Sequence, residues 1–186
     1  MYIGKQLEKY AVEVLKGIGI EKGQTILDCC CGAGAYTIPA AQLVGKEGLV
    51  YAVDVSNGEL NDLKQGVSLG RLQNVEIIQE DVELRIPLPD SSVDVVLLYD
   101  IFWYFRPTES KLSKLLQEVY RVAKPDALIS VYPTHIDSSS LKYFKNEMKN
   151  TSFNLESKYS RKIVHEKSIE RGELLNFRKV EKSKAD

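Results

Sequence analysis

The stretch from Thr25 to Thr37, TILDCCCGAGAYT, constrains the fold of this chain more than any other. Its first apolar residues are typical of a buried strand, and Asp28 is an acid near the end of that strand. Gly32 and Gly34 then make a turn of small residues, and an apolar helix face follows. Glycines let the backbone approach a ligand closely, and a helix N-terminus presents free N–H groups. The stretch therefore indicates a site for a nucleotide-like ligand.

The dinucleotide-binding pattern G-x-G-x-x-G/A fits this turn poorly. When Gly32 and Gly34 are taken as its first two glycines, the third position falls on Thr37, which is neither Gly nor Ala. A glycine pattern alone is in any case weak evidence. A nicotinamide-dependent oxidoreductase is thus disfavoured and stays as an alternative.

Composition restricts the class of protein. The 186 residues are 44% hydrophobic and 27% charged, which suits one globular domain with a real core. The net charge of -1 gives no basic field for nucleic acid, so no nucleic-acid partner is indicated. No stretch resembles a signal peptide or an apolar membrane span. These observations predict a cytoplasmic protein.

All three cysteines are consecutive, at positions 29–31. Neighbouring residues on a strand point to opposite faces, so these cysteines are not placed to form an ordinary disulfide or a C-x-x-C metal site. We expect reduced cysteines that serve as small strand and loop residues, and the sequence predicts no metal site.

Hydrophobic periodicity divides the rest of the chain into alternating strands and helices. Helices are expected at residues 4–18, 35–44, 109–123 and 138–150, with a further helix from a Ser56–Glu59 capping box to about Gly70. Strands are expected at residues 25–30, 49–54, 75–79, 93–99, 127–132, 154–164 and 173–180, the last two joined near Arg171–Gly172. This order predicts an α/β fold: a parallel sheet with helices on both faces and a C-terminal antiparallel hairpin.

Several segments in the same order resemble the class I S-adenosylmethionine (SAM)-dependent methyltransferases. Residues 28–34, DCCCGAG, are similar to the D-x-G-x-G-x-G motif of that family, with Cys30 in place of the first glycine. A side chain at Cys30 should keep its backbone from positive φ. Residues 118–125, EVYRVAKP, resemble E-x-x-R-V-L-K-P-G-G, with Asp126–Ala127 in place of the final glycines. Three further segments carry the likeness: residues 53–54, 80–82 and 87–94.

The likeness is strongest to the short methyltransferases related to ubiquinone and menaquinone biosynthesis, and it covers almost the whole chain. It implies one SAM-dependent methyltransferase domain with a Rossmann-like seven-stranded sheet over residues 1–186. Within that domain, residues 1–22 form an N-terminal helix, 23–133 the SAM-binding core, 134–181 a C-terminal helix and strands, and 182–186 a tail.

The resemblance also implies the residues that contact SAM. Asp54 accepts the two ribose hydroxyls, Asp81 accepts the adenine amino group while the Val82 N–H faces the ring, and Asp28 orients the methionine end through its ammonium and a water. Glu80 is an alternative to Asp81, and a purely structural carboxylate is the alternative at each position. The remaining cofactor contacts are expected at Cys30, Gly32, Gly34, Val55 and Tyr99.

The acceptor is expected beyond the fourth strand, since open α/β sheets bind ligands at the carboxyl ends of their strands. Trp103 and Tyr104 are candidates for the pocket wall, although either could instead pack into the core. Asp100 and His135 are weak candidates for a catalytic base. His165 is assigned no role.

Methyl transfer from SAM needs alignment and exclusion of water more than a dedicated base, because the cofactor carries the activated group. A non-catalytic SAM-binding module is the second alternative, kept open by the altered glycines at Cys30 and Asp126–Ala127. The chain shows no N-P-P-[YF] motif and no large insertion before the hairpin. A small-molecule acceptor is therefore favoured, at a shallow site or one closed by the N-terminal helix or a second subunit. The acceptor, the oligomeric state and the pathway are not fixed by the sequence.

Overall fold

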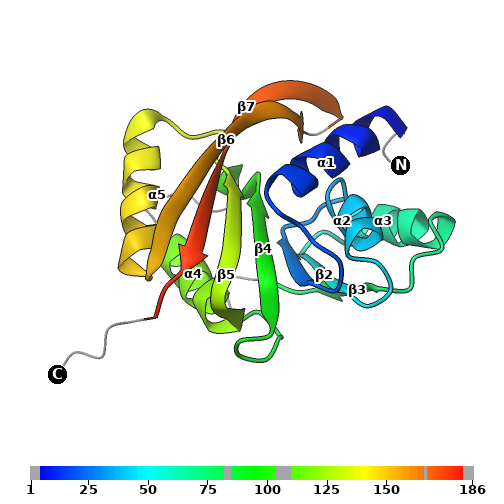
Figure 1. Ribbon diagram of the computed structural model, residues 1–186, viewed down its shortest axis with the longest axis horizontal. Coiled ribbons are helices and arrows are strands. Elements are labelled where there is room, and N and C mark those ends of the chain that lie inside the picture. The colour runs from blue at the N-terminus through cyan, green and yellow to red at the C-terminus, as the bar shows by residue number, and fades with distance from the viewer. Residues whose placement is uncertain (1–4, 82–84, 104–109, 166, 182–186) are drawn as a thin grey trace.

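The computed structural model describes residues 5–81, 85–103, 110–165 and 167–181. Their strands form one sheet with helices on both faces (Figure 1). The helices are α1 (Lys5–Gly17), α2 (Thr37–Val44), α3 (Asn57–Leu69), α4 (Ser110–Val122) and α5 (Ser138–Asn150), with a 3-10 turn, η1, at Ile101–Trp103. The strands are β1 (Thr25–Cys29), β2 (Leu49–Asp54), β3 (Val75–Gln79), β4 (Val93–Tyr99), β5 (Ala123–Tyr132), β6 (Phe153–His165) and β7 (Ser168–Lys179).

The sheet has the order β3-β2-β1-β4-β5-β7-β6. Strands β1 to β5 pair in parallel, β7 runs antiparallel to β5, and β6 pairs antiparallel to β7. This confirms the predicted fold class. The carboxyl ends of the parallel strands meet at one edge, and β1 lies between β2 and β4. Its end is therefore the topological switch point, where open sheets of this kind bind ligands.

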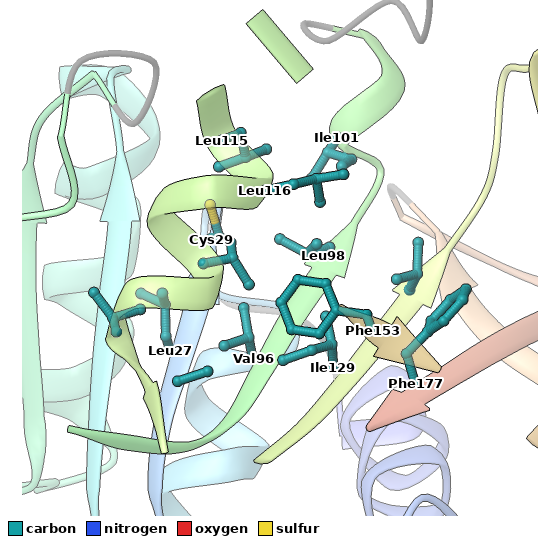
Figure 2. Packing of buried hydrophobic residues seen from close by; sticks show 14 of the residues in the cluster. Leu27, Cys29, Val96, Leu98, Ile101, Leu115, Leu116, Ile129, Phe153 and Phe177 are labelled. Atoms are coloured by element: carbon teal, nitrogen blue, oxygen red, sulfur yellow. The ribbon is translucent and has the colours of Figure 1, made fainter. Parts of the chain in front are cut away.

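The core lies on both faces of the sheet. On one face, α4 and α5 cover side chains of the central strands; Figure 2 shows Leu115 and Leu116 of α4 over Leu27, Val96 and Leu98. On the other face, α1 and α2 cover the alternate residues of β1 and β4. Strands buried on both faces read as continuous apolar runs, as 93–99 does.

Local sequence explains where α3 begins. The Ser56 hydroxyl accepts a hydrogen bond from the Glu59 N–H at 3.4 Å, as the capping box predicts. Leu60 and Leu63 of α3 then pack under β2. The predicted cap of α4, Thr108, lies outside the described residues, but the five apolar residues expected on the inner face of α4 are all buried: Leu112, Leu115, Leu116, Val119 and Val122.

The first residues of α2 and β5 differ from the prediction. Helix α2 begins at Thr37, two residues late, because residues 31–36 form the turn after β1. Strand β5 begins at Ala123, directly after α4, and contains Pro125. Its pairing with β4 is interrupted between Val93 and Val95, where Asp126 has φ 60°, so the proline occupies an irregular part of the strand.

The predicted hairpin turn at Arg171–Gly172 is wrong. Both residues lie inside β7, opposite Lys162 and Arg161, and the chain reverses between His165 and Ser168. Gly172 serves a close approach: a Cβ there would lie 2.5 Å from atoms of both Ile163 and Tyr132. The hairpin is therefore longer than predicted.

The hairpin reaches past β5 and across the carboxyl edge of the sheet. Strand β5 pairs with β7 only over Leu175–Arg178, so the preceding residues of β7 extend beyond the end of β5. In Figure 1 this part of the hairpin arches over the top of the sheet toward α1. Its tip is fixed to the turn after β1, since the Tyr36 hydroxyl donates to the Val164 carbonyl at 2.9 Å and accepts from the Val164 N–H at 3.1 Å.

Candidate functional site

The turn after β1 has a backbone shape that favours glycine. Cys30, Gly32 and Gly34 have φ values of 62°, 51° and 85°. The expectation that Cys30 avoids positive φ is thus wrong: its side chain tolerates a conformation that costs a residue with a Cβ roughly 1–2 kcal/mol. The Cys31 N–H donates to the Val53 carbonyl at 3.1 Å, which ties the turn to β2. The turn keeps its shape although the first glycine of the motif is absent.

Gly34 also allows α3 to lie against the turn. A Cβ at Gly34 would be 2.3 Å from Cδ1 of Leu63, a fully buried side chain of α3. The side chain of Glu59, in the first turn of α3, also approaches the turn, since a Cβ at Gly32 would lie 3.8 Å from its carboxylate.

Asp54 ends β2 at the edge of this turn. One of its carboxylate oxygens accepts from the Gly32 N–H at 2.9 Å, and the other accepts from the Ser56 N–H at 2.8 Å. The residue is 8% exposed. Each oxygen keeps a further lone pair, so the carboxylate is held in a fixed orientation and can still accept from a ligand.

Asp28 lies deeper in the same turn and is 4% exposed. The Thr37 hydroxyl, at the first residue of α2, donates to its carboxylate at 2.6 Å. Burial raises the pKa of Asp28 from 3.8 to about 6, against the hydrogen bond from Thr37, which lowers it; nearby Asp54 raises it further. The sequence did not predict that Thr37 contacts Asp28. Its position, nine residues after Asp28, is the only sequence signal of this contact.

The residues expected around an adenine lie beyond β2 and β3. Val55 is 51% exposed, which is unusual for a valine next to a buried strand and leaves its side chain available to an apolar ring. Asp81 follows β3 and is half-buried, whereas Glu80 is exposed. The predicted contact at Val82 lies outside the described residues.

The aromatic residues after β4 divide between core and edge. Tyr99 is buried, with its hydroxyl 2.9 Å from the Ser130 hydroxyl, and its ring packs edge-on against Tyr36 at 4.7 Å. Phe102 is also buried and packs against Phe144. Trp103 ends η1, but its side chain lies outside the described part of the structure, as does all of Tyr104. Their roles in the pocket stay predictions.

Three polar side chains meet where β4, β5 and the hairpin come together. Nε2 of His135 lies 3.1 Å from Nε2 of His165, and Oδ1 of Asp100 lies 3.4 Å from the same atom of His165. The Thr134 hydroxyl donates to the Asp100 carboxylate. Burial raises the pKa of Asp100, while the Thr134 hydrogen bond and the histidines lower it. The two weak candidates from the sequence, Asp100 and His135, are thus neighbours, and His165, which was assigned no role, is their partner.

The E-x-x-R motif of α4 has a structural role. Arg121 forms a salt bridge with Glu118 at 2.7 Å and donates to the backbone carbonyls of Ile86 and Leu88. Glu118 in turn accepts from the Ile86 N–H at 3.0 Å. The pair therefore fixes the segment before β4 onto α4.

Comparison with known proteins links this sheet and its glycine turn to a protein family. Residues 26–126, more than half of the chain, match a family model described as "Methyltransferase domain". Demethylmenaquinone methyltransferase from Geobacillus sp. (strain WCH70) is 34% identical over 140 residues, which is 73% of this chain and 58% of that relative. The chain thus spans about 58% of the length of this curated relative.

Solved structures agree in fold. A SAM-dependent methyltransferase from Aquifex aeolicus has a TM-score of 0.74 at 26% identity, with 94% of this chain and 93% of that chain covered. A magnesium protoporphyrin IX methyltransferase from Synechocystis with bound SAM shares the fold, with a TM-score of 0.66 at 18% identity and 94% and 78% coverage.

Among the described residues, no helix has the length and apolarity needed to cross a membrane. The match of the family model, together with the seven-stranded sheet and the glycine turn at its switch point, confirms the resemblance noted in the sequence. This chain belongs to the class I SAM-dependent methyltransferases.

Proposed function

We propose that this chain transfers a methyl group from SAM to a small-molecule acceptor of the quinone type in its reduced form, a hydroquinone with a hydroxylated aromatic ring. The observation that carries SAM binding is the carboxylate of Asp54, held at the switch point by the N–H groups of Gly32 and Ser56. The acceptor class is suggested by the relatives that are named demethylmenaquinone methyltransferase.

In this proposal the adenosine lies along the ends of β2 and β3. Asp54 accepts the ribose hydroxyls through its remaining lone pairs, and its charge disfavours a 2′-phosphate. The exposed side chain of Val55 contacts the adenine face, and Asp81 accepts the exocyclic amino group. Cys30, Gly32 and Gly34 bring the backbone close to the cofactor, and Tyr99, whose ring is buried, contributes only main-chain atoms.

Asp28 serves the methionine end of the cofactor. A pKa of about 6 leaves its carboxylate mostly ionised at pH 7. Because that ionised form is poorly solvated, it gains from a neighbouring cation, and the ammonium of SAM is such a group. Thr37 fixes the carboxylate in place for this contact.

SAM supplies an already activated methyl group, so the task of the protein is positioning, which can contribute about 7–11 kcal/mol. The β6–β7 hairpin helps here, since its tip contacts both Tyr36 and the carboxyl edge beyond β4. In this proposal it forms one wall of the acceptor site, a role that the sequence did not assign to it; closure by the N-terminal helix or by a second subunit stays a prediction. Asp100 and His135 then face the acceptor and hold its polar oxygen, and Trp103 and Tyr104 are the proposed aromatic part of the pocket.

Calorimetry with SAM, S-adenosylhomocysteine and NAD tests the cofactor. Both SAM species should bind and NAD should not; binding of NAD alone would contradict the proposal and restore the oxidoreductase alternative. Asp54→Asn should weaken S-adenosylhomocysteine by about 1.5–3 kcal/mol, the scale of hydrogen bonds to a charged group.

Ser56→Ala is the matched control. It removes the hydroxyl that caps α3 but keeps the Ser56 N–H that holds Asp54. It should lower the free energy of unfolding by about 1 kcal/mol and leave cofactor affinity unchanged. If both variants lose affinity equally, the effect comes from α3 and not from the carboxylate.

Isotopically labelled SAM tests the acceptor. Hydroxylated naphthalenes should become labelled, and amines and nucleic acids should not. Binding of SAM without labelling of any acceptor, in pure compounds or in cell extracts, would support the non-catalytic module instead.

A further inference from the structure

We propose that Asp100, His135 and His165 form a binding site for a first-row divalent metal ion of the Zn²⁺ type. The ligand atoms of the three side chains all lie within 4.8 Å of one another. They come from three separate parts of the chain: the end of β4, the segment after β5, and the tip of the hairpin. His135 and His165 are also the only histidines in the sequence.

Two of the three spacings between the ligand atoms match metal coordination, and all three atoms lie within 4.8 Å of one another. With metal–ligand distances of about 2.0–2.1 Å, neighbouring ligands of a tetrahedral ion lie about 3.3 Å apart. Nε2 of His135 and Nε2 of His165 are 3.1 Å apart, and Oδ1 of Asp100 is 3.4 Å from Nε2 of His165. A small shift of these side chains therefore places an ion among them.

His165 has the supporting partner that metal-binding histidines usually have. Its Nδ1 lies 3.0 Å from a carboxylate oxygen of Glu170 on β7, and the Tyr132 hydroxyl donates to the same oxygen at 2.5 Å. A proton on Nδ1 directed at Glu170 leaves the lone pair of neutral His165 on Nε2, the atom that faces His135 and Asp100. Carboxylates that orient a ligating histidine in this way are typical of zinc sites.

The backbone supports the same reading. Asp100 and His135 have φ values of 58° and 59°, a left-handed conformation that Asp and His adopt more often than most residues with a Cβ. Both residues follow the ends of different strands, and their side chains meet at one point.

The ligand set selects the class of ion. Two imidazoles and one carboxylate suit Zn²⁺ and its neighbours, whereas Mg²⁺ and Ca²⁺ prefer oxygen ligands alone. Three protein ligands leave a coordination position for water or for a ligand oxygen. Resting on the proposed function, that oxygen is the hydroxyl of the acceptor, which binds as its anion and releases its proton to solvent.

The experiment uses the full chain freed of metal with a chelator. We expect calorimetry to show one equivalent of Zn²⁺ bound and no binding of Mg²⁺, and Co²⁺ to give a visible spectrum typical of nitrogen and oxygen ligands. His135→Gln and His165→Gln should each abolish this binding. Because His135 is exposed, its variant keeps the fold and decides the result if the His165 variant does not fold.

Glu170→Gln should weaken Zn²⁺ by about 10–100-fold, the usual cost of losing such a supporting carboxylate. Glu173→Gln, on the same strand and paired with Lys158, is the matched control and should leave the affinity unchanged. Cys30→Ser tests for binding by the thiols, and should not alter the Co²⁺ spectrum.

Zn²⁺ binding that persists in both histidine variants, or that is absent from the parent protein, would overturn the inference. Calorimetry with S-adenosylhomocysteine is run on the same metal-free sample. Cofactor binding without Zn²⁺ binding would contradict the metal site and support the proposed function. Zn²⁺ binding without cofactor binding would support the metal site and contradict the proposed function.

Discussion

The substitution Asp28→Asn should stabilise the ligand-free protein at neutral pH while it weakens cofactor binding. Burial raises the pKa of Asp28 from 3.8 to about 6. That difference corresponds to about 3 kcal/mol in favour of the neutral acid, at about 1.4 kcal/mol per pH unit. Asparagine is neutral at every pH, and its side-chain oxygen can still accept the Thr37 hydroxyl. The substitution therefore removes the cost of burying a charge and keeps the hydrogen bond.

The direction in which stability changes with pH follows from the protons that the folded and unfolded states bind. Between pH 4 and about pH 6 the folded protein holds a proton on Asp28 that the unfolded chain has released. Stability conferred by this group is thus fully present below pH 4 and is lost as the pH rises through about 6. The difference in unfolding free energy between variant and parent should be small at pH 4. It should grow to about 3 kcal/mol by pH 7 and stay level above that.

Urea unfolding followed by circular dichroism, at half-unit steps from pH 4 to pH 8, measures this difference. Thr37→Val is the companion variant, because it removes the hydrogen bond that lowers the pKa of Asp28 and should move the transition to higher pH. A difference that is independent of pH would refute the reasoning. Tighter binding of S-adenosylhomocysteine by Asp28→Asn would show instead that the carboxylate does not face the ammonium.

Three further predictions concern other parts of the fold. Arg121→Ala should lower the free energy of unfolding by about 2–4 kcal/mol, measured by urea unfolding, because it removes the guanidinium that donates to the carbonyls of Ile86 and Leu88 and pairs with Glu118; an effect below 1 kcal/mol would contradict this. Gly34→Ala should cost about 2–4 kcal/mol from its φ of 85° and the contact with Leu63, and a thermal melt equal to that of the parent would show that the turn relaxes freely. Trp103→Ala should keep S-adenosylhomocysteine affinity within about threefold, under roughly 0.7 kcal/mol, and strongly reduce labelling of the acceptor; lost affinity with unchanged turnover would place Trp103 against the cofactor.

The fold was largely readable from the sequence because strands and helices alternate with distinct periods. The positions of Asp28 and Asp54 could be predicted for a related reason: acids at the ends of buried apolar strands lie at the carboxyl edge of a parallel sheet. The left-handed backbone of Cys30 could not be predicted, since a residue with a Cβ disfavours positive φ. The hydrogen bonds of the turn to Asp54 and β2 override that preference.

The cluster of Asp100, His135 and His165 was not predicted, because the hairpin turn was placed a few residues too far along the chain. Reading Gly172 as a turn shortens the hairpin and places its tip at residues 171–172, whereas the tip lies beside His165. The true reason for that glycine is the neighbouring Tyr132 and Ile163, a contact that depends on the strands already being paired. Close approach between distant segments leaves no periodic pattern, so sequence reasoning had no means of bringing His165 to Asp100.

The attachment of the hairpin tip to Tyr36 has a consequence for how the protein matures. Tyr36 and Val164 are 128 positions apart in the chain. A ribosome that has finished β1 and its glycine turn must therefore add most of the remaining polypeptide before that contact can form. Contacts so distant in sequence form slowly and late. The parallel strands can associate during synthesis, but the contact between Tyr36 and Val164 forms only after the hairpin has emerged. Until then the hairpin does not cover the carboxyl edge of the sheet, and exposed apolar surface and unpaired strand edges favour aggregation of a nascent chain.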